Sequence, residues 1–479
     1  MKVAFRFLRF AGVVVLVFAA ITAATFASAA TPAGLSAEQT QWLAKATRHE
    51  KAGWIYLHIE GKPRERGFQH GYLLAAEIAE SLRVDRAQWL HDTSFDWAWL
   101  VEHTKGFVLP ALDAELRDEL AGIAEGTKAA GHPVSFEDLA IDNAWFELSG
   151  YWWPLASKKM TGFDSVEKPK QSCSSFIATG RMTKDGGIVL GHNTWFGYVD
   201  AVFNVVIDLV PAKGHRILMQ TKPGWIHSGT DFFLTDAGLV GSETTIGGFQ
   251  HFTEKGIPEF ARMRRATQDA SNIDEWCAII KKGNNGGYAN AWLIGDVKTG
   301  EIARLELGLK YVGFERTKDG FFIGSNIAEN LNILRLETNT NDGDIRLPSV
   351  ARRVRWKQLM KENAGKIDVA LGESMLADCY DTCLDKENPS ARTLAGHSEL
   401  DPSIGVGTPY RPGGAFDSKV IDTAMAKQMR FAGRWGSADG IGFDADAFLH
   451  AHPQFDWMTG LLKSRPTQPW TEFRAGEKN

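Results

Sequence analysis

The order of helix-like and strand-like segments most constrains how this chain can fold. Before residue 173 the apolar residues recur mainly with helical spacing, as in 113–129, where Leu116, Leu120 and Ile123 form one face. After residue 173 the pattern changes to short runs of β-branched and aromatic residues separated by turns such as Lys298-Thr299-Gly300. Helical periodicity returns in blocks at 257–270, 273–282, 349–362 and 367–378. This order predicts an α+β protein in which helices pack on antiparallel sheet.

The individual elements can be predicted from the same patterns. In the N-terminal part we expect a helix from the capping box at Ser36 to about Arg48, a strand over 54–61 and a helix over 135–146. Gly67 and Gly71, on either side of a Gln-His pair, predict a close approach of two backbones. The strands expected later are 174–179, 187–193, 202–210, 215–220, 231–235, 238–245, 288–295, 301–307 and 321–325.

Composition limits the class of protein. The chain has 479 residues, of which 44% are hydrophobic and 23% charged, with a formal net charge of -5. Such a chain can build a large core, and its negative charge argues against nucleic acid as a partner. Because no long Pro-, Ser- or Gly-rich linker interrupts it, we expect one large, interwoven unit.

The first 29 residues have the pattern of a signal peptide. Lys2, Arg6 and Arg9 precede an apolar run over 11–24, and a small-x-small cleavage pattern follows at 27–29. A membrane anchor is the alternative, but the run is short for a bilayer span of about 20 residues. We therefore expect segment 1–29 to be removed and the protein to be exported to a periplasmic or extracellular space, without a stable membrane anchor.

The four cysteines do not describe a disulfide scaffold in a chain of this length. Cys379 and Cys383 lie four residues apart and either pair or are simply buried. Cys277 lies in an apolar run and is expected in the core. Cys173 has no partner suggested by spacing.

Cys173 opens a predicted hairpin whose turn contains Asp185-Gly186. A catalytic cysteine needs a base within reach. If the Ser172–Cys173 bond is cut, the new α-amino group of Cys173, with an ordinary pKa of about 7.7–8.0, supplies that base. One residue then carries both nucleophile and base. The alternative is that Cys173 is a small buried apolar residue.

The hairpin sequence resembles a known family. CSSFIA at 173–178 followed by GHNTW at 191–195 is similar to the phospholipase B-like branch of the N-terminal-nucleophile hydrolases, which are related to choloylglycine hydrolases and penicillin acyltransferase-like peptidases. Further similar segments are GKPRERGFQHG at 61–71, SETTIG at 242–247, GYANAW at 287–292 and PGGAFDSKV at 412–420.

The resemblance implies a four-layer αββα sandwich formed by 173–479, preceded by a mainly helical segment, 30–172. Self-cleavage between Ser172 and Cys173 would separate these two parts, which we expect to stay associated. The polar stretch 158–170 is a candidate for the exposed connection between them.

The resemblance also implies site residues. Cys173 is the nucleophile, Asn290 matches an oxyanion or substrate-orienting asparagine, and Arg352 matches an active-site arginine. The hairpin adds His192, Asn193 and Trp195, and Trp195 stands where choloylglycine hydrolases carry an aspartate, which leaves open what orients the α-amine. Thr245 matches a family asparagine, with Thr244 as the alternative. By residue type alone, His192 and Asn290 also suit structural hydrogen bonds, and Arg352 a solvated helix face.

The implied function is hydrolysis of an acyl ester or amide bond, with a small molecule or lipid as substrate. We place lipid-like acyl substrates first, because the nearest motifs are those of the phospholipase B-like branch. The alternatives are a penicillin acyltransferase-like amidase or peptidase on linear amides, and a noncatalytic exported binding protein with the same fold. We expect no metal and no cofactor.

Overall fold

The computed structural model describes residues 34–163, 173–200, 204–229, 232–403 and 407–478. The chain divides into two units, Met1–Leu35 and Ser36–Asn479, and every helix and strand reported below lies in the second. The predicted signal peptide, 1–29, and Ser172 of the predicted cleavage bond lie outside the described residues.

The larger sheet has nine strands in the order β1-β2-β5-β6-β7-β8-β9-β10-β11. Its neighbours are antiparallel except for β2 and β5, which run parallel. The strands are β1 (Thr47–Lys51), β2 (Trp54–Gly61), β5 (Val205–Pro211), β6 (Ile217–Thr221), β7 (Phe232–Thr235), β8 (Leu239–Thr245), β9 (Asn290–Asp296), β10 (Glu301–Leu307) and β11 (Val312–Thr317).

The second sheet has six strands in the order β12-β3-β4-β15-β16-β17, all antiparallel. A separate two-stranded ribbon is formed by β13 and β14. The strands are β3 (Cys173–Thr179), β4 (Val189–Gly197), β12 (Gly320–Gly324), β13 (Tyr380–Asp381), β14 (Lys386–Glu387), β15 (Gly413–Asp422), β16 (Arg430–Trp435) and β17 (Thr471–Arg474).

The helices before Cys173 form a group of their own, and those after it lie between strands. The first group is α1 (Ala37–Leu43), α2 (Pro63–Leu73), α3 (Ala75–Thr93), α4 (Trp97–Val108), α5 (Ala114–Ala129), α6 (Phe136–Asn143), α7 (Trp145–Glu147) and α8 (Trp153–Thr161). The second is α9 (Glu259–Asp269), α10 (Ile273–Lys281), α11 (Leu331–Leu336), α12 (Pro348–Glu362), α13 (Val369–Leu376), α14 (Thr423–Lys427) and α15 (Ala445–Ala451).

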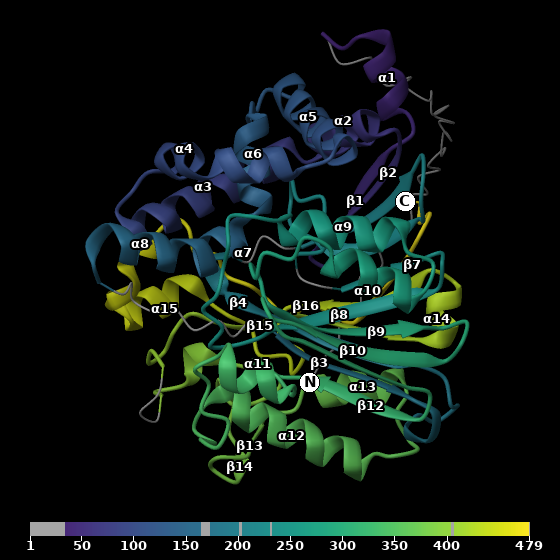
Figure 1. The fold of residues 1–479 in the computed structure, drawn as a ribbon, viewed down its shortest axis with the longest axis vertical. Helices are drawn as coiled ribbons and strands as arrows, with labels where there is room; N and C mark the ends of the chain where they lie inside the picture. Colours follow the sequence, from purple (N-terminus) through teal and green to yellow (C-terminus); the bar gives the residue numbers. More distant parts are fainter. Residues whose placement is uncertain (1–33, 164–172, 201–203, 230–231, 404–406, 479) are drawn as a thin grey trace, which may run out of the picture. The chain divides into compact units, whose positions relative to one another are not determined.

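The two sheets pack face to face, and helices cover their outer faces (Figure 1). Helices α9 and α10 lie on the nine-stranded sheet, while α12 and α13 lie on the six-stranded sheet. A hydrogen bond of 2.7 Å between Ser175 Oγ on β3 and Ser242 Oγ on β8 joins the sheets directly. The predicted α+β class and the four-layer αββα order are therefore confirmed.

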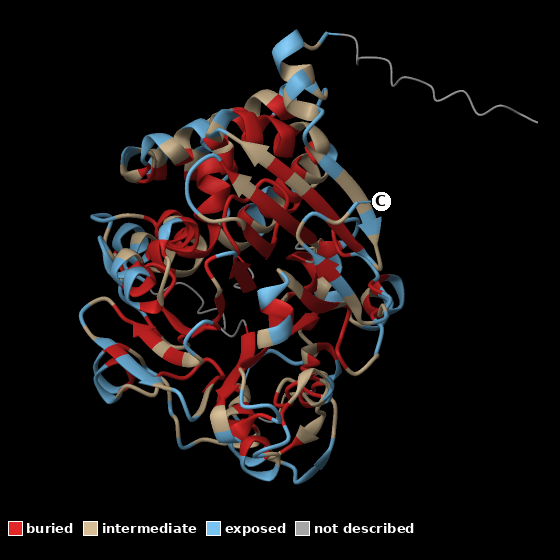
Figure 2. Cartoon of the chain, turned by 90° about the vertical axis from the view of Figure 1, so that its right-hand side faces the viewer, coloured by how far each residue is buried: buried red, intermediate tan, exposed pale blue. Residues whose placement is uncertain are grey.

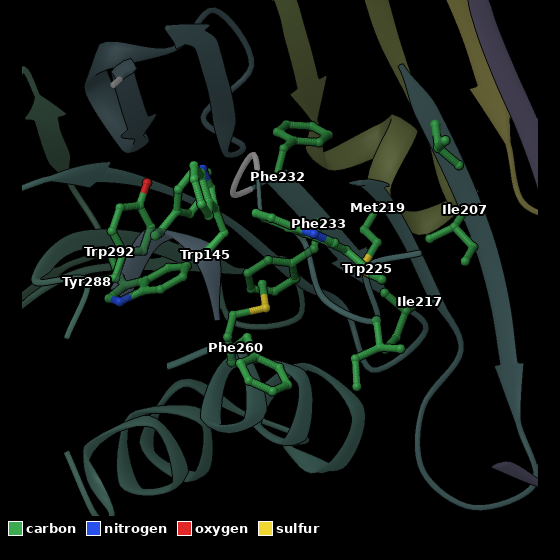
Figure 3. Close-up of a cluster of buried hydrophobic side chains, with 14 of the residues drawn as sticks. Trp145, Ile207, Ile217, Met219, Trp225, Phe232, Phe233, Phe260, Tyr288 and Trp292 are labelled. Atoms are coloured by element: carbon green, nitrogen blue, oxygen red, sulfur yellow. The ribbon is translucent and has the colours of Figure 1, made fainter. Parts of the chain in front are cut away.

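Burial follows these layers. Figure 2 shows the strands mostly buried, whereas exposed residues lie on the outer sides of helices and in loops. In Figure 3, Trp145 from the N-terminal part lies in one apolar cluster with Trp225, Phe260 and Trp292 from the later part. A second cluster, which contains Phe176 and Trp356, fills the space between the six-stranded sheet and its helices. The N-terminal part thus shares its core with the rest of the unit.

Most predicted elements occur within a few residues of their expected limits, with three differences. The helix expected up to Arg48 ends at Leu43, and 47–51 is strand β1 instead, because it pairs with β2. Strands β11 and β13–β17 were not predicted. Of the connection predicted at 158–170, the first residues belong to α8 and 164–172 lie outside the described residues.

No helix among the described residues combines the length and apolar character that crossing a bilayer requires.

Candidate active site

Cys173 is the first residue of β3 and is buried between the two sheets. In the register with β4 it lies directly opposite Thr194, and Ser175 lies opposite His192. Directly opposed residues share a face of the sheet, so these four side chains project to the same side. Because Ser175 bonds to Ser242 and His192 bonds to the carbonyl oxygen of Glu243, this side is the one that faces the nine-stranded sheet.

The alternate residues of the hairpin face the helices. The amide nitrogen of Asn193 donates to the carbonyl oxygens of Leu376 and Leu394, each at 2.9 Å, and its Oδ1 accepts from Ser418 at 2.6 Å. The ring of Trp195 packs 4.3 Å from the guanidinium carbon of Arg352. The three hairpin residues predicted for the site are thus divided, with only His192 on the face of the Cys173 side chain.

Arg352 reaches Cys173 from helix α12. Its side chain is fully buried; Nη1 donates to the carbonyl oxygen of Cys173 at 2.7 Å and Nη2 to Oδ1 of Asn326 at 2.8 Å. Burial lowers the pKa of Arg352 to about 9, and the neighbouring Cys173 acts in the opposite direction. Arg352 is therefore not part of a solvated helix face, and it holds the first residue of β3 in place.

His192 is buried and uncharged. Its Nε2 lies 3.1 Å from the carbonyl oxygen of Glu243, and since a carbonyl only accepts, the ring proton is on Nε2. No partner for Nδ1 occurs among the residues that the structure describes. Burial, with a smaller contribution from Lys419, holds the pKa of His192 well below its ordinary value. Nδ1 thus carries a lone pair.

Thr245 and Asn290 meet at the adjoining ends of β8 and β9, where they are paired in register. The hydroxyl of Thr245 donates to the Tyr288 oxygen at 3.0 Å, and Tyr288 donates to Oε1 of Glu243 at 2.8 Å. When the side-chain oxygen and nitrogen of Asn290 are assigned so that both find suitable partners, the nitrogen donates to Oε2 of Glu243 at 2.9 Å. Glu243 therefore links the predicted residues: its carboxylate binds Asn290 and, through Tyr288, Thr245, while its backbone carbonyl oxygen binds His192.

The surroundings of Cys173 favour the neutral thiol. Burial is the main factor that raises the pKa of Cys173 well above its ordinary value, and the negative charge of Glu243 and, more weakly, of Asp417 adds to this effect. A hydrogen bond from the Trp195 backbone N–H and the positive charge of Lys419 act the other way. A thiolate here needs further positive charge or hydrogen-bond donors.

Several residues of this region were not predicted from the sequence, namely Thr194, Glu243, Asn326, Asp417 and Lys419. Strand alternation was a usable signal for Thr194, since it follows His192 by two residues. Glu243 and Lys419 lie inside segments that carry the family resemblance, but only the packing of the two sheets shows that they approach Cys173.

The other cysteines are free thiols in this structure. Cys379 and Cys383 are not bridged, and Cys379 Sγ donates to Oδ2 of Asp439 at 3.1 Å. Cys277 is buried in α10, as predicted. Within the described ranges no group of three or more His, Cys, Asp or Glu side chains has the arrangement to hold a metal ion.

Comparison with known proteins supports the resemblance. A family model described as Phospholipase B matches residues 128–312, a segment that contains Cys173, Thr245 and Asn290. Human putative phospholipase B-like 2 (Homo sapiens) is 31% identical over 147 residues, which cover 26% of this chain and 24% of that protein. Putative phospholipase B-like 1 of Caenorhabditis elegans is 23% identical over 392 residues, 73% of this chain and 66% of that protein. The predicted resemblance to phospholipase B-like proteins is confirmed.

The extent of these matches is limited. The chain spans about a quarter to two fifths of the length of the first curated relatives that it matches, 24% and 42%. Among solved structures, a variant of the conjugated bile acid hydrolase from Clostridium perfringens aligns with a TM-score of 0.33 and 12% identity, over 54% of this chain and 88% of that protein.

Proposed function

We propose that this protein is an exported, self-processing hydrolase in which Cys173 becomes an N-terminal nucleophile that cleaves acyl ester or amide bonds. The observation that carries the proposal is the position of Cys173. It is the first residue of a strand inside the six-stranded sheet, Arg352 binds its carbonyl oxygen, and its side chain faces the inter-sheet layer that holds His192 and Lys419. The Phospholipase B match over 128–312 and the signal-like segment 1–29 support it further.

The chemistry would begin on the chain itself. Cys173 Sγ attacks the carbonyl carbon of Ser172, the peptide C–N bond breaks, and the resulting thioester is hydrolysed by water. The products are a carboxylate on Ser172 and a free α-amine on Cys173. This amine then takes the thiol proton when Sγ attacks the acyl carbon of a substrate, and returns it to the departing alcohol or amine. Asn290 would donate to the oxyanion in exchange for one of its present hydrogen bonds, to Glu243 Oε2 or to the carbonyl oxygen of Ala289.

We propose a lipid-like acyl ester as the substrate class, because the relatives that the chain matches bear phospholipase B-like names. A thioester intermediate is equally able to form from a linear amide, so the substrate must be determined by direct comparison. Fatty acid release from phosphatidylcholine and from an N-acyl amide should be measured on the same preparation. A marked preference for the amide would reverse our order of substrates.

Self-cleavage is tested by intact mass and N-terminal sequencing of the purified protein. We expect a large fragment that begins at Cys173, and an uncut chain without turnover in Cys173→Ala. Cys277→Ala is the matched control, because this second buried cysteine lies in α10 and should leave cleavage unchanged. A chain that stays whole and shows no thiol-dependent turnover would exclude the proposed enzyme, and Cys173→Ala cut at the same bond would exclude self-cleavage.

A further inference from the structure

A buried lysine and aspartate lie in the layer between the two sheets, close to Cys173. Both Lys419 and Asp417 are on β15 and are fully buried. The ammonium group of Lys419 donates to Asp417 Oδ1, to Gln220 Oε1 at 2.5 Å and to Thr194 Oγ1 at 2.5 Å. Gln220 closes the group by donating to Asp417 Oδ2 at 2.5 Å. All three hydrogens of the ammonium group are therefore used.

A β-bulge brings this pair to the nucleophile. The register between β15 and β4 shifts between Ala415 and Asp417, so that Asp417 lies opposite Thr194 and Lys419 opposite His192. Since Thr194 in turn lies opposite Cys173, the side chains of Cys173, Thr194 and Asp417 form one row across three strands. Lys419 belongs to the next row on the same face.

Stability does not explain such a pair. Removing an ammonium and a carboxylate from water is costly, and a well-packed apolar pair is often at least as stable. Functional sites are where burial and charged neighbours are arranged to shift the pKa of a reactive group. The reactive group here is the Cys173 thiol. The charge of Lys419 acts to lower its pKa, against the larger effect of burial.

Thr194 connects Lys419 to Cys173. Because an ammonium group only donates, Thr194 Oγ1 must accept from Lys419, which leaves the hydroxyl hydrogen of Thr194 for a second partner. A hydroxyl whose oxygen is bound to a cation is a stronger donor. The side chain directly opposite in register is that of Cys173.

We propose that Lys419, held by Asp417 and Gln220, acts through the Thr194 hydroxyl to stabilise the thiolate of Cys173. Lys419 and Thr194 are positioning residues, and the proton leaves the thiol for the α-amine of Cys173. This inference rests on the proposed function. Among the described residues, the other charged or titratable groups near Cys173 are Glu243 and Asp417, whose negative charges oppose the thiolate, Arg352, which binds the Cys173 carbonyl oxygen, and neutral His192.

The test is a pH titration of the Cys173 thiolate by its ultraviolet absorbance, as the difference between each chain and its Cys173→Ser counterpart. Thr194→Val should raise the midpoint by about one pH unit, the effect of losing one hydrogen bond to the charged form. Thr194→Ser, which keeps the hydroxyl, should restore the original midpoint. Lys419→Met should raise it further, and Lys427→Met, at an exposed lysine on the neighbouring helix α14, should not change it.

The titration midpoint can be measured whether or not the protein turns over a substrate. If Lys419→Met does not fold, the Thr194 variants alone are sufficient to test the inference, because they leave the Lys419–Asp417 pair in place. A Thr194→Val midpoint equal to that of the unsubstituted chain would overturn the inference, as would an equal shift in Lys427→Met. An unprocessed, inactive chain that still shows the Thr194 shift would remove the proposed hydrolase but keep the effect of Lys419 on the thiol.

Discussion

Two buried histidines show how neighbouring groups determine whether a histidine side chain is charged. His192 meets a backbone carbonyl, so burial prevails and holds its pKa low. His397 is also buried, but its Nδ1 lies 2.7 Å from Glu399 and its Nε2 lies 2.9 Å from Asp439. Burial would lower the pKa of His397, yet these carboxylates outweigh it and raise the pKa to about 9. His397 is thus a cation that joins the loops around 397 and 439.

This charge predicts a pH dependence of stability. The pKa of His397 is higher in the folded chain, about 9, than the ordinary value of about 6.5, so its contribution is complete below pH about 6.5 and is lost as the pH rises to about 9. The free energy of unfolding, measured by denaturant titration, should fall by a few kcal/mol across this window. His397→Gln should remove most of that slope, whereas His132→Gln, at an exposed histidine, should retain it. An unchanged slope in His397→Gln would contradict the assignment.

At the scale of elements, helices α2 and α5 pack through glycine. A Cβ atom built on Gly67 would lie 2.1 Å from the carbonyl oxygen of Glu119, and one on Gly71 would lie 2.1 Å from that of Ile123. Glycines on α5 face α2 in the same way, with Gly126 2.4 Å from the carbonyl oxygen of Phe68. The close backbone approach predicted from Gly67 and Gly71 is confirmed.

Gly71→Ala should therefore be destabilising. The added methyl group meets backbone atoms that no side-chain rotation can move, and overpacking of this kind costs about 1–3 kcal/mol. Thermal unfolding should show a lower midpoint for this variant. The matched control is Gly106→Ala on α4, where no atom lies within 4 Å of the added carbon and alanine favours the helix by up to about 1 kcal/mol. Equal midpoints for the two variants would show that the helices can separate without cost.

At the scale of the whole unit, the part before Cys173 is built into the part after it. Strand β2 pairs with β5 in the nine-stranded sheet. Lys222 forms buried ion pairs with Asp85 and with Asp142, the latter at 3.1 Å. The buried carboxylate of Glu119 binds Arg264 at 3.0 Å. These contacts join 34–163 to the later residues through backbone pairing, charge and apolar packing together.

We therefore predict that cleavage at Ser172–Cys173 leaves the two fragments associated. Gel filtration of the cleaved protein under native conditions should give one peak containing both, at the volume of uncut Cys173→Ala. The fragments should separate only in denaturant, because separation would expose the shared core and break the β2–β5 pairing. A small fragment that elutes alone from the native column would refute this prediction.

The local sequence pattern explains which strands and helices could be predicted. Strands β3, β8 and β10 were predicted from sequence because β-branched and turn residues mark them, and helix α5 because its apolar face repeats. Strand β15 was missed because it begins with two glycines and buries Asp417 and Lys419, a composition typical of a loop. Its place in the sheet depends on pairing with β4, far away in sequence.

The amino-acid sequence by itself determined the α+β class, the hairpin that begins at Cys173 and the phospholipase B-like resemblance, which in turn implied the αββα order. The tertiary structure alone decided which side chains surround that cysteine. Strand alternation turned Asn193 and Trp195 toward the helices and Thr194 toward the other sheet, while packing of the sheets buried Glu243 and Lys419 nearby. The physical reason is that periodicity is a local property of the chain, whereas the charges that act on a buried thiol come from strands distant in sequence.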